Sequence, residues 1–141
     1  MANEVFLDSA FAIALSSPSD EFHQQAILWA DQLQKSKTRL VTTRAVCLEI
    51  GNALAKLKYR QAAIKLLRSI ENDPNIEITA LSEELYRRAF QLYQERRDKE
   101  WGLTDCISFT LMQNRGIHQA LTTDEHFQQI GFRVLLREQP Q

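Results

Sequence analysis

Apolar positions along the chain follow two spacings, one typical of buried strands and the other of helices. Short apolar runs predict five strands, at about 5–7, 39–42, 76–78, 119–122 and 132–136. Between them, apolar residues recur every three or four positions, which predicts helices over about 10–15, 20–33, 43–57, 61–70, 82–99 and 104–114. Because strands and helices alternate, we expect an α/β fold, a three-layer sandwich with a mostly parallel central sheet whose strand order stays open.

The expected helix ends carry residues that cap or stop a helix. Thr43 and Thr104 stand where a hydroxyl can accept a backbone N–H at a helix start. Pro74 disfavours helix in the residue before it, and Gly116 suits the left-handed residue that follows a helix. These signals place the boundaries of the helices within the chain.

Composition sets limits on the class of protein. A chain of 141 residues, 44% of them hydrophobic, suits a single domain, residues 1–141, with an apolar core. The net charge of −1 is unlike that of a broadly basic nucleic-acid-binding protein, so any RNA contact needs a local basic rim. Cys47 and Cys106 lack metal-site spacing and are expected to be buried. Without a membrane-length apolar stretch or signal-peptide features, we expect a cytoplasmic protein.

Three acidic residues stand where strands end or helices begin. Asp8 ends the first strand, Asp124 follows the strand at 119–122, and Asp105 directly follows Thr104 at the expected first position of its helix. In an open parallel sheet, ligands bind beyond the carboxyl ends of the strands. We therefore expect Asp8 and Asp124 on one rim of the domain, although Asp105 alone also fits a helix cap and Asp124 an ordinary turn.

Glu49 is a fourth acid in a different setting. It lies inside a helix, three or four residues from Ala45 and Val46, and so projects from an apolar stripe. Burying an isolated carboxylate is costly, so such a residue usually has a cation or a basic partner. The alternatives to a metal ion are Arg44 and Lys56 on the same helix.

Together the four acids indicate metal-dependent chemistry. Gathered carboxylates raise one another's pKa values, and hard divalent cations such as Mg²⁺ or Mn²⁺ relieve this because they prefer oxygen ligands. Such ions activate a water for attack on a phosphodiester and stabilise the leaving oxygen. The predicted catalytic and metal-binding residues are Asp8, Glu49, Asp105 and Asp124.

Four blocks of the chain resemble PIN domains. They are VFLDSAFAIAL at 5–15, residues 43–54 around Glu49, LTDCIS at 103–108, and ALTTDEHF at 120–127 followed by GFRVL at 131–135. Length and closing pattern are most similar to VapC-type toxins of prokaryotic toxin–antitoxin pairs. The resemblance implies an endoribonuclease that uses Mg²⁺ or Mn²⁺, forms a homodimer and is inhibited by a small antitoxin. It also implies that Asp8, Glu49 and Asp105 are the principal metal ligands and Asp124 the supporting acid.

The resemblance further implies that hydroxyl groups position these acids, with Thr104, Thr122 and Thr123 as candidates. Candidate RNA contacts are Arg44, Lys56 and Arg115, each of which also fits an ion pair or a solvated helix end. His126, a lone histidine two residues after Asp124, is expected to pack or to hydrogen-bond in a turn rather than bind a metal. Trp29, Phe90 and Tyr93 are expected in the core or on a dimer surface.

Two other functions compete with the nuclease. A phosphotransfer or phosphatase domain with a nucleophilic Asp8 is disfavoured, because such an aspartate is commonly followed two residues later by a second acid and Ala10 stands there. A catalytically inert PIN-like module that binds RNA or a protein is the second alternative. The complete set of four acids argues against that loss of activity.

Overall fold

The centre of the protein is a five-stranded, wholly parallel sheet with the strand order β3-β2-β1-β4-β5. The computed structural model describes residues 3–140, so Met1, Ala2 and Gln141 of the expected single domain lie outside the described residues. In chain order the elements are β1 Glu4–Leu7, α1 Ser9–Ser16, α2 His23–Lys35, β2 Arg39–Thr43, α3 Arg44–Ala53, α4 Leu57–Asn72, β3 Ile76–Thr79, α5 Glu83–Glu95, α6 Leu103–Arg115, β4 Gln119–Leu121, α7 Glu125–Gln129 and β5 Arg133–Val134.

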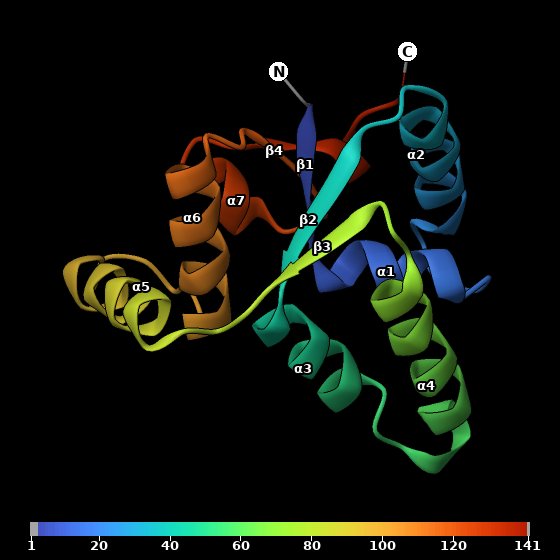
Figure 1. Cartoon of the computed structure of the whole chain (residues 1–141), viewed down its shortest axis with the longest axis horizontal. Helices are drawn as coiled ribbons and strands as arrows, with labels where there is room; N and C mark the ends of the chain where they lie inside the picture. Colours follow the sequence, from blue (N-terminus) through green and yellow to red (C-terminus); the bar gives the residue numbers. More distant parts are fainter. Residues whose placement is uncertain (1–2, 141) are drawn as a thin grey trace.

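Helices cover both faces of the sheet, which confirms the predicted three-layer α/β architecture. Helices α1, α2 and α4 lie on one side, and α6 and α7 on the other, with α5 packed against the outside of α6 (Figure 1). Val5, Phe6 and Leu7 of β1 are almost completely buried because the strand is central and covered on both faces. The uninterrupted apolar sequence of this strand therefore follows from its place in the fold.

The order of the strands creates a switch point between β1 and β4. The chain continues from β1 to β2 on one side, whereas β4 and β5 are added on the other side. Ligands of open parallel sheets bind where connections leave in opposite directions, beyond the carboxyl ends of the strands. Asp8 and Asp124 follow the two strands that flank this point.

Two of the predicted helix ends are confirmed and one is wrong. The Thr43 hydroxyl accepts the Val46 N–H at 3.1 Å, and Gly116 after α6 has a φ of 68°. Helix α6, however, begins at Leu103 with Gly102 as its cap, so Thr104 is not the cap and Asp105 is the third helical residue. The Asp105 carboxylate accepts the Gly102 N–H at 3.3 Å, which satisfies a donor at the helix start.

Several other boundaries differ from those predicted. The last strand covers only Arg133–Val134, and a 3-10 turn at Leu135–Arg137 follows it. Leu135 and Leu136 of this turn are buried, so its sequence resembles that of a buried strand. Helix α4 begins at Leu57, and α5 ends at Glu95. Cys47 and Cys106 are buried free thiols, as predicted. Within residues 3–140, the helices lack the combined length and apolar character that crossing a bilayer requires.

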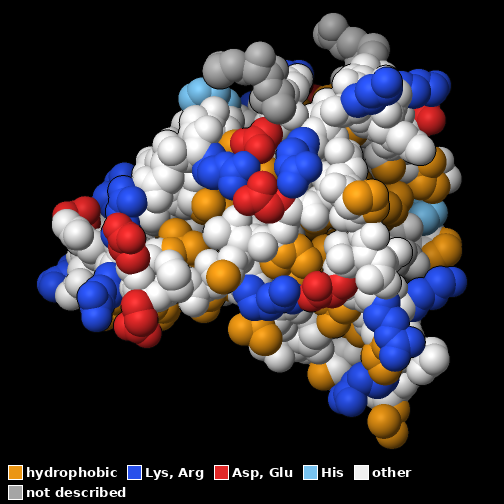
Figure 2. Space-filling view, viewed as in Figure 1, with side chains coloured by type: hydrophobic (Ala, Val, Ile, Leu, Met, Phe, Trp, Pro, Cys, Tyr) orange, Lys and Arg blue, Asp and Glu red, His pale blue; other side chains and the backbone are white. Residues whose placement is uncertain are grey.

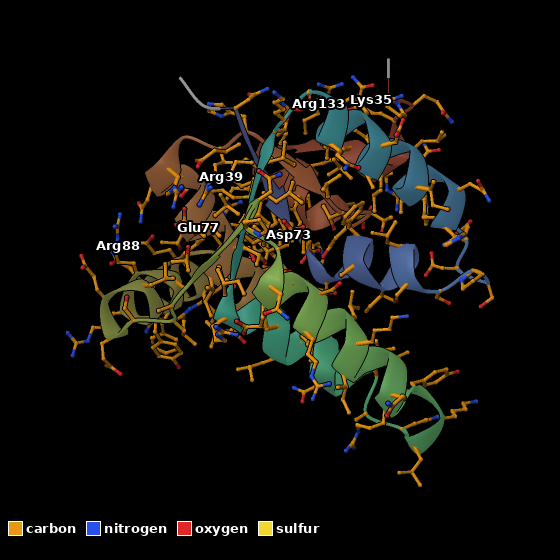
Figure 3. All side chains as sticks on the ribbon, turned by 45° about the vertical axis from the view of Figure 1, so that its right-hand side comes forward. Lys35, Arg39, Asp73, Glu77, Arg88 and Arg133 are labelled. Carbon is orange, nitrogen blue, oxygen red and sulfur yellow. The ribbon has the colours of Figure 1, made fainter. Side chains whose placement is uncertain are left out.

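Charged side chains link four elements at the amino end of the sheet. Arg115, at the end of α6, donates to Glu77 of β3 at 2.6 Å and to Glu4 of β1 at 2.7 Å. Arg39 of β2 lies 3.6 Å from Glu77, and Figure 3 shows Arg39 and Glu77 next to each other on the sheet. Because α6 runs antiparallel to the strands, its last residue lies at the end opposite the acids that follow β1 and β4.

Candidate metal centre

The four predicted acids come from four separate elements and gather at the carboxyl end of the sheet. Asp8 caps α1, Glu49 lies within α3, Asp105 is in the first turn of α6, and Asp124 caps α7. The charges of Glu49 and Asp105 both act on Asp8, and those of Asp124 and Glu49 both act on Asp105. The structure therefore brings all four into one electrostatically coupled group.

Asp8 is the most buried of these acids, with 5% of its surface exposed. Its Oδ2 accepts a hydrogen bond from the Thr122 hydroxyl at 2.7 Å. Loss of hydration, aided by the charges of Glu49 and Asp105, raises the pKa of Asp8 to about 7, although the Thr122 hydrogen bond opposes the rise. A nearby positive charge would therefore favour the ionised form of Asp8, and the surrounding acids do not supply one.

Glu49 is half-buried and accepts a hydrogen bond from the Ser9 hydroxyl at 2.5 Å. Ser9 is the first residue of α1, so this bond joins the start of α1 to the middle of α3. The sequence analysis gave Ser9 no role. Its position directly after Asp8 is the one signal that could have identified it.

Asp105, Asp124 and His126 form a tighter cluster, in which one ligand atom from each lies within 4.8 Å of the others. His126 Nδ1 is 3.4 Å from Asp105 Oδ2 and 3.3 Å from Asp124 Oδ1. Burial and then the charge of Asp124 raise the pKa of Asp105, against the lowering effects of the Gly102 N–H and His126. The expected turn hydrogen bond also exists, because the His126 backbone N–H donates to Asp124 at 2.9 Å. The imidazole, however, faces the acids, which the sequence analysis did not foresee.

Of the three candidate hydroxyl groups, Thr122 is the one that contacts the acids. Besides donating to Asp8, its oxygen accepts the Asp124 backbone N–H at 3.1 Å. Within residues 3–140, the Thr104 and Thr123 side chains make no hydrogen bond to an acid; the Thr123 carbonyl instead accepts from Arg137 at 2.7 Å. Thr122 alone therefore links the loop after β4 to Asp8.

The three candidate RNA contacts lie in different environments. Arg44 forms an ion pair with Glu71, which occupies its guanidinium. Arg115 pairs with Glu4 and Glu77 at the amino end of the sheet, away from the acids, so the structure does not bring it to the site as expected. Lys56 lies exposed in the turn between α3 and α4.

The donor set of this site fits a divalent metal ion. Asp8, Glu49, Asp105 and Asp124 offer hard carboxylate oxygens, and His126 adds an imidazole at the edge. In the described part of the chain, no Lys or Arg forms an ion pair with any of the four acids. A cation bound among these acids would compensate the raised pKa values of Asp8 and Asp105.

Comparisons with known proteins find relatives over most of the chain. A family model described as the PIN domain matches residues 5–133. The 23S rRNA-specific endonuclease VapC20 of Mycobacterium tuberculosis is 26% identical over 129 residues, which cover 91% of this chain and 95% of that protein. The VapC20 crystal structure aligns with a TM-score of 0.79 at 24% identity, over 91% of this chain and 95% of that one.

Two solved toxin–antitoxin complexes have a similar fold. VapBC2 from Rickettsia felis, bound to a promoter DNA fragment, aligns with a TM-score of 0.69 at 14% identity, over 93% of this chain and 96% of that one. DNA-bound VapBC from Salmonella typhimurium aligns with a TM-score of 0.63 at 17% identity, over 95% and 97%.

Proposed function

This chain belongs to the PIN domain family, and on that premise we propose that it is an endoribonuclease that depends on Mg²⁺ or Mn²⁺. The observation that carries the proposal is the burial of Asp8 among other acids, which raises its pKa to about 7. A carboxyl group in that setting is only partly ionised at neutral pH, and a nearby cation would favour its ionised form. The proposed metal ligands are Asp8, Glu49 and Asp105, with Asp124 as the supporting acid.

The chain's own residues hold and orient these ligands. Thr122 holds one oxygen of Asp8, and Ser9 holds one oxygen of Glu49, which limits the orientations that these acids can adopt toward an ion. His126 lies against Asp105 and Asp124, and its contact with Asp105 favours the ionised form of that acid. When bound, the ion supplies the positive charge that activates a water and stabilises the phosphodiester during hydrolysis.

RNA is the proposed substrate because carboxylate-held divalent ions suit phosphodiester hydrolysis and because VapC20, a relative over most of the chain, is named as an rRNA endonuclease. The proposal for this chain is cleavage of RNA, without a named target. The inert PIN-like module remains the alternative function, and it predicts RNA or protein binding without cleavage.

The decisive experiment incubates the purified protein with total cellular RNA, with Mg²⁺ or Mn²⁺ and with excess EDTA. We expect cleavage with metal and none with EDTA, because the acids cannot act without the ion. Asp8→Asn and Asp105→Asn are each expected to lower the cleavage rate by at least about 100-fold, since each removes a charged ligand. Glu125→Gln, an exposed acid beside the site, serves as the matched control and should retain activity.

Two results would contradict this function. Cleavage that persists in excess EDTA and in both Asp variants would exclude the proposed metal site. RNA binding by a folded wild-type protein that cleaves none of the RNA panel with either metal would favour the inert module.

We also propose that a small antitoxin protein binds this chain. A hollow of about 630 Å³ opens between α1, α2 and α4, and apolar side chains such as Phe11, Leu33 and Leu66 line it. A segment of a partner with apolar side chains on one face would fill it. The similarity to VapBC complexes supports an antitoxin as that partner.

A homodimer is the third part of the proposal. Tyr86, Phe90 and Tyr93 form a stacked row on α5, with ring centroids 6.2 and 6.3 Å apart. Between 40% and 47% of each residue is exposed. Aromatic residues are enriched in protein interfaces, and an exposed row of three suits the same face of a second copy.

A further inference from the structure

The segment between Glu49 and Glu71 carries positive charges and no negative ones. Residues 50–70 contain five of the 17 Lys and Arg residues and no Asp or Glu, which leaves 12 cations against 18 acids in the rest of the chain. The five cations are Lys56, Lys58, Arg60, Lys65 and Arg68, which we call the basic arm. A chain with a net charge of −1 therefore carries a local cationic surface that its total charge conceals.

All five cations of the basic arm are exposed and available to a ligand. Throughout residues 3–140, none of them forms an ion pair, in contrast to Arg44, Arg115 and Arg133 elsewhere. Figure 2 shows Lys and Arg side chains gathered at the lower right, over α4 and the turn before it. Farther along α4, Lys65 and Arg68 line a shallow hollow of about 330 Å³.

The tip of the arm combines these charges with exposed apolar groups. Leu57 is 90% exposed, and Tyr59 is 42% exposed with the Lys58 ammonium 5.0 Å from its ring centroid. Arg60 donates to the Ala55 carbonyl at 2.8 and 3.2 Å, which fixes the turn between α3 and α4. Cations interleaved with an aromatic ring on a fixed turn suit a nucleic acid, whose phosphates contact the cations and whose bases stack on the ring.

The arm is connected directly to the metal centre. Lys56 follows Glu49 by seven residues and stands three residues after Ala53, the last residue of α3, so the arm begins close in the chain to one of the acids. The acid cluster repels phosphates when no cation is bound, and the arm supplies the attraction that the cluster lacks. An RNA strand cleaved at the acids would run over this surface within a few nucleotides.

We propose that the basic arm is an RNA-anchoring surface that binds the substrate backbone beside the cleavage site. This inference rests on the proposed function for the identity of the polyanion. Because the arm acts on binding, its loss raises the KM for RNA and leaves the kcat at saturating RNA unchanged.

The test measures RNA binding in the Asp8→Asn background, where cleavage does not interfere. The arm variant Lys56→Gln/Lys58→Gln/Lys65→Gln is compared with a control, Lys35→Gln/Lys37→Gln/Arg133→Gln, that removes the same charge at the amino end of the sheet. Figure 3 shows Lys35 and Arg133 together there, far from the arm. The probe is a fluorescein-labelled RNA hairpin, titrated by anisotropy between about 50 and 200 mM salt.

We expect the arm variant to bind about tenfold more weakly near 100 mM salt, with the slope of log K against log salt reduced by about 2. The control should change affinity by less than about twofold, and the Lys→Arg arm variant should bind like the parent. Equal affinity of arm variant and control would overturn the proposal. So would unchanged RNA binding together with weakened self-association in sedimentation, which would make the arm a contact between copies.

Failure of this inference is distinguishable from failure of the proposed function. If the arm substitutions leave the KM of metal-dependent cleavage unchanged, the proposed role of the basic arm is wrong and the proposed nuclease function stands. If the wild-type protein cleaves no RNA but binds it through the basic arm, the proposed nuclease function is wrong and the proposed role of the arm stands.

Discussion

At the scale of single residues, Thr122 determines how the acids are held. Its hydroxyl donates to Asp8 and accepts the Asp124 N–H, so one side chain fixes two acids from different strands. Ser9 holds Glu49 in a similar way. Acids restrained like this stay close together even when no cation balances their charges. The site is therefore arranged for an ion, and without one its uncompensated charge lowers the stability of the folded protein.

That cost predicts how stability depends on pH in the metal-free protein. The pKa of Asp8 rises from 3.8 to about 7 on folding, so between these values the folded state holds a proton that the unfolded state has released. The free energy of unfolding should therefore fall as pH rises through this window, by on the order of a few kcal/mol. Asp8→Asn should flatten the dependence, because asparagine does not titrate.

Urea unfolding at pH 5 and pH 8 in EDTA measures this effect. Mn²⁺ added at pH 8 should stabilise the wild-type protein more than Asp8→Asn, since the ion takes the place of the proton. If the free energy of unfolding changes by the same amount between pH 5 and pH 8 in the wild-type protein and in Asp8→Asn, Asp8 is not held in the uncharged form.

Sequence alone identified the acids better than it identified their neighbours. Asp8 and Asp124 could be located because strand ends are visible in the apolar pattern and converge in a parallel sheet. Ser9 and His126 could not be assigned, since Ser9 meets Glu49 across 40 residues and His126 meets Asp105 across 21. Such pairs depend on the angle at which helices approach each other, which spacing along the chain does not specify.

At the scale of elements, strands were easier to predict than their ends. Phe132, Val134, Leu135 and Leu136 are all buried, so a strand of two residues and the following 3-10 turn look like one strand. Helix α6 starts earlier than expected because the Asp105 side chain closes its first turn in place of Thr104. Local capping chemistry therefore decided boundaries that hydrophobic periodicity left open.

Helix α5 carries a prediction about assembly. If its aromatic row packs against a second copy, Phe90→Glu at the centre of the row should convert a dimer to a monomer, because a buried, unpaired carboxylate is costly. Gln91→Glu introduces the same charge at an exposed position about 100° around α5 from Phe90 and should leave the dimer intact. Sedimentation equilibrium distinguishes the two masses, and a dimer that survives Phe90→Glu would exclude this interface.

At the scale of the whole molecule, the groove between α1, α2 and α4 and the acid site can be altered independently of each other. Ser69 is an exposed, small residue that lines the groove between α1, α2 and α4, so Ser69→Trp should fill the groove without removing core contacts. We expect Ser69→Trp to weaken binding of the proposed antitoxin by at least about tenfold, as measured by titration calorimetry. RNA cleavage by Ser69→Trp alone should be unchanged.

Ser19→Trp, an equally small and exposed position outside the groove, is the control for that experiment. Binding that tolerates Ser69→Trp as well as Ser19→Trp would show that the partner contacts another surface. Loss of cleavage in Ser69→Trp would show instead that the groove and the acids are conformationally linked.

The central place of β1 has a consequence for protein synthesis. This strand is made before the other four, yet one of its two neighbours, β4, spans residues 119–121 and follows β2, β3 and six helices along the chain. Until then β1 has an open edge, and Asp8 lacks both Thr122 and Asp124. A nascent chain that stalls before β4 therefore lacks the complete group of acids, so the site is assembled only after most of the sheet has been made.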